Sequence, residues 1–427
     1  MITVVIPTIG RATLRDALAA VGPGIPVIVV DDRFEPGTVR SIYQGGGTHT
    51  KEPPAVKSPP PISSQPPELS GSESSEPGQP SAPAESSEPT EPTEPTDLAD
   101  LADLAGLADL ADLPPHVRVV RSGGRGPAAA RNAGWRAADT PWVVFLDDDV
   151  IPAPGWADAV WKDLVDLPHD VGGSQGRIEV PLPAGRRPTD GERHTAGLTG
   201  ALWVTADMAY RRSALEAVGG FDERFPRAYR EDADLALRMT RAGHRLVRGE
   251  RVTRHPVRND GFWASVRFQR GNADDALMRR LHGPAWRADI GGGRGRLRLH
   301  ALTTAAGLGA ALLGTAAAIA SRTRPSTHPS ARPSAGTNAG TNAGTSAGTS
   351  AGTSARTGAR TGARTFTSVA AWAAGVAWAA LTADFAWRRI APGPRTPQEV
   401  LRMAVTSVLI PPVACAHRLR GEWRARR

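Results

Sequence analysis

Cysteine is nearly absent from this chain of 427 residues, which contains only Cys415. A disulfide framework and a thiolate zinc site are therefore excluded, and any metal site must use carboxylates, histidine and water. Phenylalanine and tyrosine are also few, with 8 Phe and 3 Tyr, and 40% of the residues are apolar. Because two or three cores of ordinary size need more apolar material, we expect part of the chain to lie outside any core.

Acidic residues are rare in the C-terminal third of the chain, where the basic charge is concentrated. Residues 286–427 hold 19 Arg against four acids, a net charge of +15; the whole chain carries +8, so residues 1–285 carry −7. The arginines flank apolar, Ala-rich runs, a pattern that favours anionic lipid head groups over a nucleic-acid groove. We therefore predict a membrane as a partner, and no nucleic acid.

The first residues, MITVVIPTIG, lack the charged-then-apolar order of a signal peptide. They predict a buried strand at 2–6 that stops at Pro7, followed by a helix at 11–21 and a second apolar strand at 26–30. Asp31 and Asp32 follow directly. This strand–helix–strand unit places two acids at the C-terminal end of a strand.

The next segment cannot build a core by itself. It is rich in Pro, Ser, Glu and Gly up to about residue 95, and a Leu-Ala-Asp repeat follows at 97–113. Too little apolar surface is available there to offset the entropy of ordering, and Leu at a period of three forms no stripe on a helix. We predict a disordered insertion at 45–115.

Alternation of strands and helices resumes after this insertion. We predict a strand at 117–120, a glycine loop at 123–126, a helix at 128–138 with Pro127 in its first turn, and a strand at 142–146 that ends in three aspartates. Such alternation is typical of an α/β fold with a doubly wound, mostly parallel sheet, whose ligands bind at the C-terminal edge of the strands. All five aspartates named so far fall on that edge.

The basic region at 286–427 contains uncharged apolar runs. The runs at 301–320 and 366–383 are just long enough to span a bilayer, whereas the run at 403–416 is short and contains two prolines, which suits a re-entrant or interfacial piece. We expect hydrophobic helices at about 301–320, 366–387 and 403–416, with a flexible linker at 321–365. Arginines in the linker oppose its export, so soluble or interfacial helices are the alternative.

The adjacent carboxylates of Asp147, Asp148 and Asp149 are candidates for a metal site. Three acids after a buried strand repel one another, and Mg²⁺ or Mn²⁺ relieves this repulsion while keeping positions open for phosphate oxygens. His255 is an additional candidate ligand. A solvated acidic turn is the alternative interpretation of the three aspartates, and a structural role is the alternative for the histidine.

Glu231 and Asp232 begin a predicted helix. Acids in a first helical turn are stabilised by the helix dipole, so capping is one interpretation. The other is a general base whose pKa is raised by burial and neighbouring acids. Similarly, the glycine loop before Arg131 offers backbone N–H groups and a guanidinium to a phosphate, and Trp203 and Trp263 are either sugar platforms or ordinary packing residues.

Six short motifs follow one another along the chain. They are VVIPT at 4–8, VVDD at 29–32, ARNAG at 130–134, FLDDD at 145–149, GGFDE at 219–223 and EDADLALR at 231–238. In this order they closely resemble the family 2 glycosyltransferases of GT-A fold. The resemblance covers about residues 1–44 and 116–285, which we expect to form the glycosyltransferase domain.

The resemblance implies a role for each matching position. The donor-binding residues would be Pro7, Thr8, Asp31, Asp32, Arg131, Asp147 and Asp148. Asp147 and Asp149 match the DXD pair that holds Mn²⁺ or Mg²⁺. Asp232 matches the catalytic base of the ED motif, and Glu231 is its neighbour. Met208, Ala209 and Tyr210 match a wall of the sugar pocket.

The implied activity is inverting, metal-dependent transfer of a sugar from a nucleotide-sugar donor to a hydroxyl acceptor. The basic tail favours a lipid-linked or cell-envelope glycan as acceptor, with the catalytic domain on the cytoplasmic side of the plasma membrane. Residues 268–272 lack the QxxRW motif of processive synthases, which favours single transfers. The alternatives are a nucleotidyltransferase and a noncatalytic nucleotide-binding membrane scaffold.

Overall fold

The computed structural model describes residues 1–33, 110, 113–258, 261–322 and 351–427. Within them one sheet of eight strands has the order β3-β2-β1-β4-β7-β6-β8-β5. The strands are β1 (Ile2–Thr8), β2 (Val27–Asp31), β3 (Val117–Arg121), β4 (Trp142–Leu146), β5 (Ile151–Pro152), β6 (Val171–Glu179), β7 (Asp207–Arg211) and β8 (Arg245–Arg254). All run in one direction except β5 and β7. The expected α/β class with a mostly parallel sheet is confirmed.

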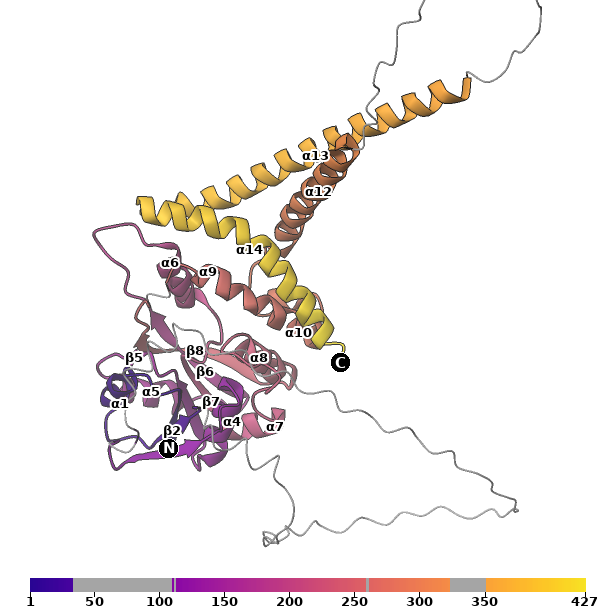
Figure 1. Cartoon of the computed structure of the whole chain (residues 1–427). Coiled ribbons are helices and arrows are strands. Elements are labelled where there is room, and N and C mark those ends of the chain that lie inside the picture. The colour runs from indigo at the N-terminus through magenta and orange to yellow at the C-terminus, as the bar shows by residue number, and fades with distance from the viewer. Residues whose placement is uncertain (34–109, 111–112, 259–260, 323–350) are drawn as a thin grey trace, which may run out of the picture.

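Helices cover both faces of this sheet (Figure 1). In the sheet domain they are α1 (Leu14–Val21), α4 (Pro127–Ala137), α5 (Trp156–Leu164), α6 (Asp190–Ala196), α7 (Arg212–Val218), α8 (Glu231–Arg241), α9 (Ala264–Arg267), α10 (Gly271–His282) and α11 (Trp286–Asp289), with 3-10 helices η2 (Gly197–Gly200) and η3 (Phe268–Arg270). Residues of α1 and α5 pack on one face, and residues of α4, α7 and α8 on the other. The sheet is therefore doubly wound, as expected.

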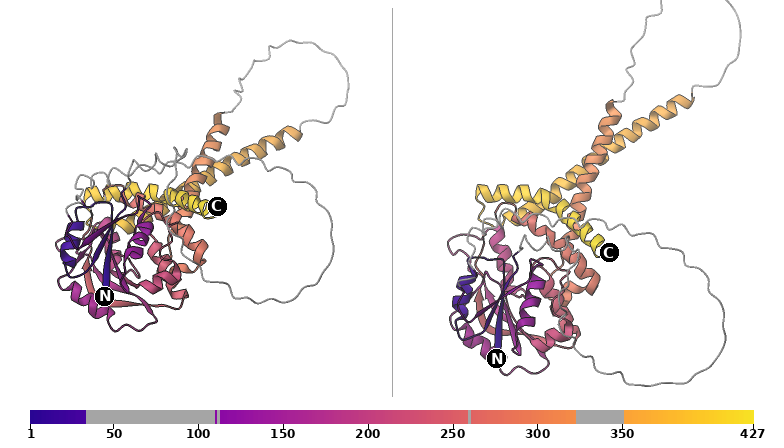
Figure 2. Two further views of the ribbon diagram at one scale, coloured as in Figure 1. Left: turned by 90° about the horizontal axis from the view of Figure 1, so that it is seen from below. Right: turned by 60° about the horizontal axis from the view of Figure 1, so that its bottom comes forward.

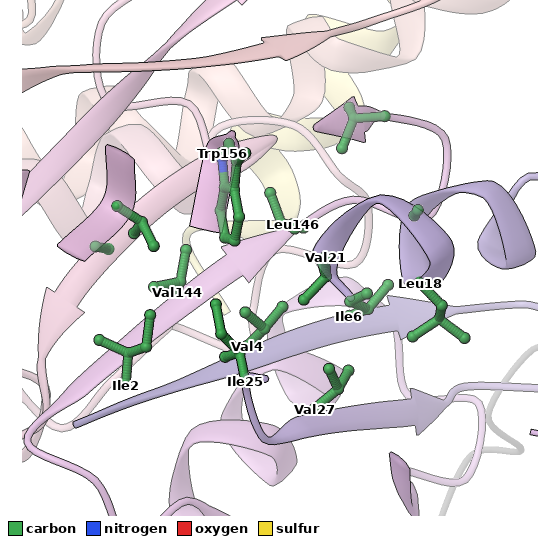
Figure 3. Close-up of a cluster of buried hydrophobic side chains, with 14 of the residues drawn as sticks. Ile2, Val4, Ile6, Leu18, Val21, Ile25, Val27, Val144, Leu146 and Trp156 are labelled. Atoms are coloured by element: carbon green, nitrogen blue, oxygen red, sulfur yellow. The ribbon is translucent and has the colours of Figure 1, made fainter. Parts of the chain in front are cut away.

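The central strands are apolar on both faces because both faces are covered. Along β1, Val4 and Ile6 join the core against α1 and α5, while Val5 joins the opposite core. Figure 3 shows the first core, in which Trp156 of α5 lies over Val144 and Leu146 of β4. This continuous burial is typical of parallel strands. Because β2, β1 and β4 run in the same direction, their C-terminal ends lie at one edge of the sheet.

The first strand is longer than predicted, since β1 continues through Pro7 to Thr8. Proline has no N–H to donate, and it is tolerated in a sheet where one side of the strand is unpaired. Pairing of β1 with β4 ends at Val5, whereas pairing with β2 continues to Thr8. Pro7 therefore has a neighbouring strand on one side only, and the expectation that it stops the strand was wrong.

Most of the predicted insertion at 45–115 lies outside the described residues. The flanking strands β2 and β3 are neighbours in the sheet, with Val27 opposite Val117. Leu110 and Leu113, at the end of the Leu-Ala-Asp repeat, are partly buried against the core. The last residues of the segment expected to be disordered thus contribute to the domain, because their leucines find apolar partners there.

Three long helices follow the sheet domain: α12 (Leu297–Arg322), α13 (Ala351–Ile390) and α14 (Pro397–Arg424). Among the described residues these three are long and apolar enough to cross a membrane. Figures 1 and 2 show α12 and α13 crossing and projecting away from the sheet domain, while α14 lies between them and the domain. Few or none of the residues in the apolar stretches of α12 and α13 are buried, whereas one-third of those in α14 are.

Two details of this region differ from the sequence-based expectation. Residues 323–350 of the expected linker lie outside the described residues, but α13 already begins at Ala351 and so includes the last part of that linker. The third helix is not a short interrupted piece, because α14 runs through Pro411 and Pro412. An interior proline costs about 3 kcal/mol; α14 nevertheless stays continuous, and it packs closely on α10, where Gly421 lies against the backbone of Ala273.

Candidate active site

A cavity of about 600 Å³ opens at the C-terminal edge of the central strands. It lies among the ends of β1 and β4, the start of α8 and the segment after β8. Of the predicted site residues it is lined by Pro7, Thr8, Asp32, Arg131, Asp147, Asp148, Asp149, Glu231, Asp232 and His255. Asp31 is absent from its walls. The two acidic clusters, more than eighty positions apart in the chain, therefore share one cavity.

The middle aspartate of the first cluster, Asp148, is fully engaged within the protein. The Thr8 hydroxyl donates to its Oδ2 at 2.6 Å, and Arg11 Nη1 donates to its Oδ1 at 2.5 Å. The side chain is 2% exposed. Asp148 thus ties the end of β1 to the end of β4, and it leaves Asp147 and Asp149 on either side for ligands.

Arg131 connects the two acidic clusters. From α4 its Nη2 donates to Asp147 Oδ1 at 2.8 Å, and its Nη1 donates to Glu231 Oε1 at 2.7 Å. The residue is 1% exposed, so desolvation disfavours its charge, yet the carboxylates of Asp147 and Glu231 outweigh this and raise its pKa. Because both terminal nitrogens are used, Arg131 acts as a fixed bridge across the cavity wall.

Glu231 and Asp232 differ in their surroundings, although both begin α8. Glu231 is 2% exposed, and burial together with the negative charge of Asp232 raises its pKa, against the opposing effect of Arg131. Burial also raises the pKa of Asp232, although the backbone N–H of Ala233 and the charge of Arg131 oppose the rise. Asp232 is partly exposed to the cavity, and its carboxylate forms no ion pair with a described side chain. It is the carboxylate better placed to accept a proton.

The residue before this pair has a strained backbone. Arg230, the N-cap of α8, has φ of 80°, in the left-handed region that only glycine adopts easily. Its guanidinium stacks on Trp286 and donates to Asp275 Oδ1 at 2.9 Å, so the side chain is anchored in the neighbouring helices. Such strain is found where a nearby group must be held in one orientation. The strained residue directly precedes the first turn of α8, which contains Asp232.

Asp149 lies beside basic groups at the other side of the cavity. His255 Nε2 is 3.7 Å from Asp149 Oδ2, and Arg258 contacts the same carboxylate. No group of three metal-ligating side chains is gathered within the described part of the chain. The available donors, two carboxylates and an imidazole at an open cavity, fit a hard divalent cation that completes its shell with water and phosphate oxygens. They do not fit a cation that needs an all-protein site.

The charge of the cavity also bears on its ligands. Its lining holds six carboxylates and four arginines. An anionic ligand would therefore meet net repulsion unless a cation accompanied it. The acid-rich lining is itself an argument for a metal-bound, rather than a free, phosphate group.

The residues at the end of β2 are held by neighbours. Arg33 donates to both carboxylate oxygens of Asp31 at 2.8 Å and lowers its pKa against the opposing effect of burial. Asp32 accepts from the Ser122 hydroxyl at 2.6 Å and from the Gly126 N–H at 3.0 Å, while burial raises its pKa. The N–H of Gly126 is thus used by Asp32 and is not free for an anion, which corrects one part of the glycine-loop interpretation.

Some predicted residues lie elsewhere. Met208, Ala209 and Tyr210 belong to β7 and are fully buried in the core, not in the cavity wall, because β7 is a central strand covered on both faces. Trp203 packs against the core and Trp263 is 46% exposed, and neither lines the cavity. Met208, Ala209 and Tyr210 therefore do not form the wall that the resemblance implied, and for Trp203 the alternative of ordinary packing holds.

Sequence reasoning missed six basic or aromatic residues of the cavity wall: Arg11, His194, Tyr229, Arg230, Arg258 and Phe268. Tyr229 and Arg230 directly precede the Glu231-Asp232 pair, and this adjacency is a signal that could have found them. Arg11 and Arg258 reach the acidic cluster from 137 and 109 positions away in the chain, so no local pattern indicates their contacts.

Part of the chain is similar to a known protein family. Residues 102–219 match the model of a family described as Glycosyl transferase family 2. The pre-mycofactocin glycosyltransferase of Mycobacterium tuberculosis is 35% identical over 136 residues, which cover 29% of this chain and 28% of that protein. The chain thus matches less than a third of the length of this curated relative.

Solved structures also align with the chain. Glucosyl-3-phosphoglycerate synthase from M. tuberculosis, solved with Mn²⁺, uridine diphosphate and phosphoglyceric acid, is 16% identical with a TM-score of 0.33, covering 66% of this chain and 79% of the synthase. TarS from S. aureus is 12% identical with a TM-score of 0.32, covering 65% of this chain and 39% of TarS.

The family match runs from before β3 to the end of α7. It includes Arg131 and all three aspartates after β4, and it ends before Glu231 and Asp232. These two residues nevertheless line the same cavity as the matched aspartates. Residues 102–219 of the chain are therefore similar to glycosyl transferase family 2.

Proposed function

We propose that this protein is an inverting, metal-dependent glycosyltransferase that moves a sugar from a nucleotide-sugar donor to a hydroxyl acceptor. The observation that carries the proposal is the bridge through Arg131, which holds the Asp147–Asp149 cluster and the Glu231-Asp232 pair on one cavity of about 600 Å³. That volume lies in the range of pockets that enclose small organic ligands. One cluster faces a diphosphate, and the other faces the group that attacks.

The proposed steps follow from the charges of the cavity. Asp232 accepts the proton of the acceptor hydroxyl as that oxygen attacks the sugar, and attack on the face opposite the leaving diphosphate inverts the anomeric carbon. Asp147 and Asp149, with His255 beside them, are the residues that would hold Mn²⁺ or Mg²⁺, and the bound cation would supply positive charge to the leaving diphosphate. Thr8 and Asp32 line the donor side, while Asp31 stabilises the adjoining turn through Arg33.

The same geometry separates this activity from its rivals. A nucleotidyltransferase that uses a phosphate nucleophile has no hydroxyl proton for a base of raised pKa to remove. A noncatalytic scaffold needs neither the base nor the strained turn that positions it. The partly exposed Asp232 beside buried Glu231 therefore favours transfer to a hydroxyl.

A membrane location is part of the proposal. The helices α12 and α13 are apolar, exposed and project from the domain, and Arg296 and Arg389 lie at their domain-side ends. Basic residues at that end favour a cytoplasmic position for the catalytic domain at the plasma membrane. An acceptor at the membrane surface, a lipid-linked or cell-envelope glycan, fits this placement. The domain limits of 1–44 and 116–285, with the tail at 286–427, belong to the same proposal.

Donor hydrolysis tests the proposal and its metal requirement together. The purified protein is incubated with UDP-, GDP- and dTDP-sugars and Mn²⁺, and we expect release of a nucleoside diphosphate from at least one donor. EDTA should abolish the release, and Asp149→Asn should raise the Mn²⁺ concentration for half-maximal rate by about tenfold, because one of few protein ligands is lost. Glu250→Gln, which changes an exposed acid outside the cavity, should leave this Mn²⁺ concentration unchanged. Release of pyrophosphate instead would indicate nucleotidyl transfer.

The pH dependence of transfer should report the Glu231-Asp232 pair. A base must be deprotonated to act, and burial raises both pKa values, so the rate should rise with pH above the ordinary carboxyl range of about 4. Glu231→Gln removes a neighbouring negative charge and should shift this rise in kcat/KM to lower pH. A rise at the same pH in both proteins would show that the pair is not the titrating group.

A further inference from the structure

A second cavity, of about 400 Å³, lies where the sheet domain meets the three long helices. Residues of α6, α9 and η3 form one side, and the domain-side ends of α12, α13 and α14 form the other. Its lining includes four arginines, Arg193, Arg296, Arg389 and Arg402, and one carboxylate, Asp190. The excess of positive charge predicts an anionic occupant.

One of these arginines has a structural task. Arg389 is 8% exposed, and its guanidinium donates to the hydroxyls of Thr406, Ser407 and Ser265 and to Asp190 at 2.8–3.0 Å. It fastens the end of α13 to α14, α6 and α9. Both terminal nitrogens of Arg389 donate to protein groups. Arg389 therefore shapes the cavity and does not select its ligand.

Arg193 is engaged as well, since it donates to the backbone oxygens of Pro188 at 2.6 Å and Arg389 at 2.9 Å. The remaining basic groups have fewer partners within the protein. Arg296 is exposed to the cavity and stacks on Phe385 with 5.9 Å between its Cζ and the ring centroid, and no described carboxylate pairs with it. Arg402 pairs with Glu399, with Nη2 to Oε1 at 3.2 Å. The imidazole of His300 is nine-tenths buried and lines the cavity, and no described residue hydrogen-bonds to its ring nitrogens. Two guanidinium groups and an imidazole N–H suit a phosphate group.

The position of this cavity indicates where that phosphate comes from. Arg296 directly precedes α12, so the cavity lies at the level where phosphate head groups meet a bilayer that α12 spans. The cavity also shares two wall residues with the first one, His194 and Phe268, whose rings stack at 4.5 Å. A ligand held here is therefore next to the site of transfer.

We propose that the second cavity is a subsite for the phosphate group of a membrane-anchored amphiphilic acceptor. Arg296 and Arg402 neutralise the phosphate, and His300 donates a hydrogen bond to it. The head group then extends past the His194–Phe268 wall toward Asp232. This assignment rests on the proposed glycosyl transfer, of which it specifies the acceptor class.

Binding of a simple phosphate amphiphile tests the subsite directly. The full chain, in a neutral maltoside detergent, is titrated calorimetrically with dodecyl phosphate and, in a separate arm, with inorganic phosphate. We expect dodecyl phosphate to bind and Arg296→Gln to weaken it by about tenfold, the effect of one charge-assisted hydrogen bond. Equal binding of inorganic phosphate would overturn a lipid source and indicate a soluble phosphorylated ligand.

The choice of variants separates the cavity from general surface charge and from misfolding. Arg298→Gln removes another exposed arginine two positions away and outside the cavity, so it should leave binding unchanged. An equal loss in that control would overturn the proposal. Since Arg402→Gln alone leaves Glu399 buried without its partner, Arg402→Gln is combined with Glu399→Gln, and this neutral pair should also weaken binding by about tenfold.

A second measurement distinguishes an acceptor from a structural lipid. If the head group enters the first cavity, a phosphodiester of dodecanol and glycerol, which carries hydroxyls beyond its phosphate, should slow hydrolysis of the donor by water, and Arg296→Gln should remove this inhibition. Binding without any effect on hydrolysis would overturn the acceptor assignment. Absence of donor hydrolysis under all conditions, with dodecyl phosphate binding intact, would instead contradict the proposed glycosyl transfer and leave the phosphate subsite in place.

Discussion

Replacing Asp232 with asparagine should lower sugar transfer by a factor of about 10²–10⁴, the usual contribution of a general base. Asparagine has nearly the same shape and occupies the same position in α8, but it cannot accept the hydroxyl proton. Asp232 forms no ion pair with a described residue, so the substitution removes no structural contact of that kind. Transfer should therefore be lost without loss of the fold.

Binding of the donor separates this expectation from a general disturbance of the cavity. Asp147 and Asp149, at the diphosphate side, are untouched by the substitution, so the Kd for the nucleoside diphosphate with Mn²⁺ should change by less than about twofold. Asp289→Asn, an exposed acid just before the cavity-lining residues 290–292, provides a control that should keep full activity. Substantial transfer by Asp232→Asn would refute the assignment of the base.

Much of the sheet was predictable because its signals are local. The strands at 117–121 and 142–146 are apolar runs bounded by turn residues, and Pro127 begins α4 as expected of a first-turn proline. Where prediction failed, the deciding contact came from another part of the chain. The end of β1 at Pro7 depends on where β4 stops pairing, and continuous α14 depends on its packing against α10.

The candidate site shows the same limit. The acidic residues were recognised because they follow strands or begin a helix, and topology then brought them to one cavity. Their cationic partners were not recognised. Nothing near Asp148 in the sequence indicates Arg11, and nothing near Glu231 indicates that Arg131 also holds Asp147. Long-range pairs of charges require the fold before they can be named.

Arg131 is expected to matter for both stability and activity. Replacing it with methionine leaves Glu231 buried and unpaired, and breaking a buried ion pair in this way costs about 3–5 kcal/mol. The pKa of Glu231 is already raised by burial and by Asp232, and loss of the guanidinium raises it further. The variant therefore protonates Glu231 more readily, which reduces the cost at low pH.

The sign of the pH effect follows from this shift. A carboxyl whose pKa is higher in the folded than in the unfolded state destabilises the fold increasingly as pH rises from the unfolded pKa toward the folded one. Arg131→Met should thus lose more stability, relative to the parent protein, above pH 8 than below it, because the two proteins bind protons differently only between the parent's folded pKa of about 8 and the variant's higher one. Thermal unfolding in detergent on either side of pH 8 measures the difference.

A double variant and a conservative one separate the two roles of the bridge. Arg131→Met combined with Glu231→Gln removes the buried charge. The free energy of unfolding of this double variant should recover, and its extra dependence on pH should disappear. Its activity should stay low because Asp147 and α8 are no longer connected. Arg131→Lys keeps the charge, but an ammonium lacks the planar fork that reaches two carboxylates 2.7 and 2.8 Å away on opposite sides. It should fold yet transfer sugar poorly. Full activity in Arg131→Lys would show that the charge alone suffices and that the bridging geometry is not required.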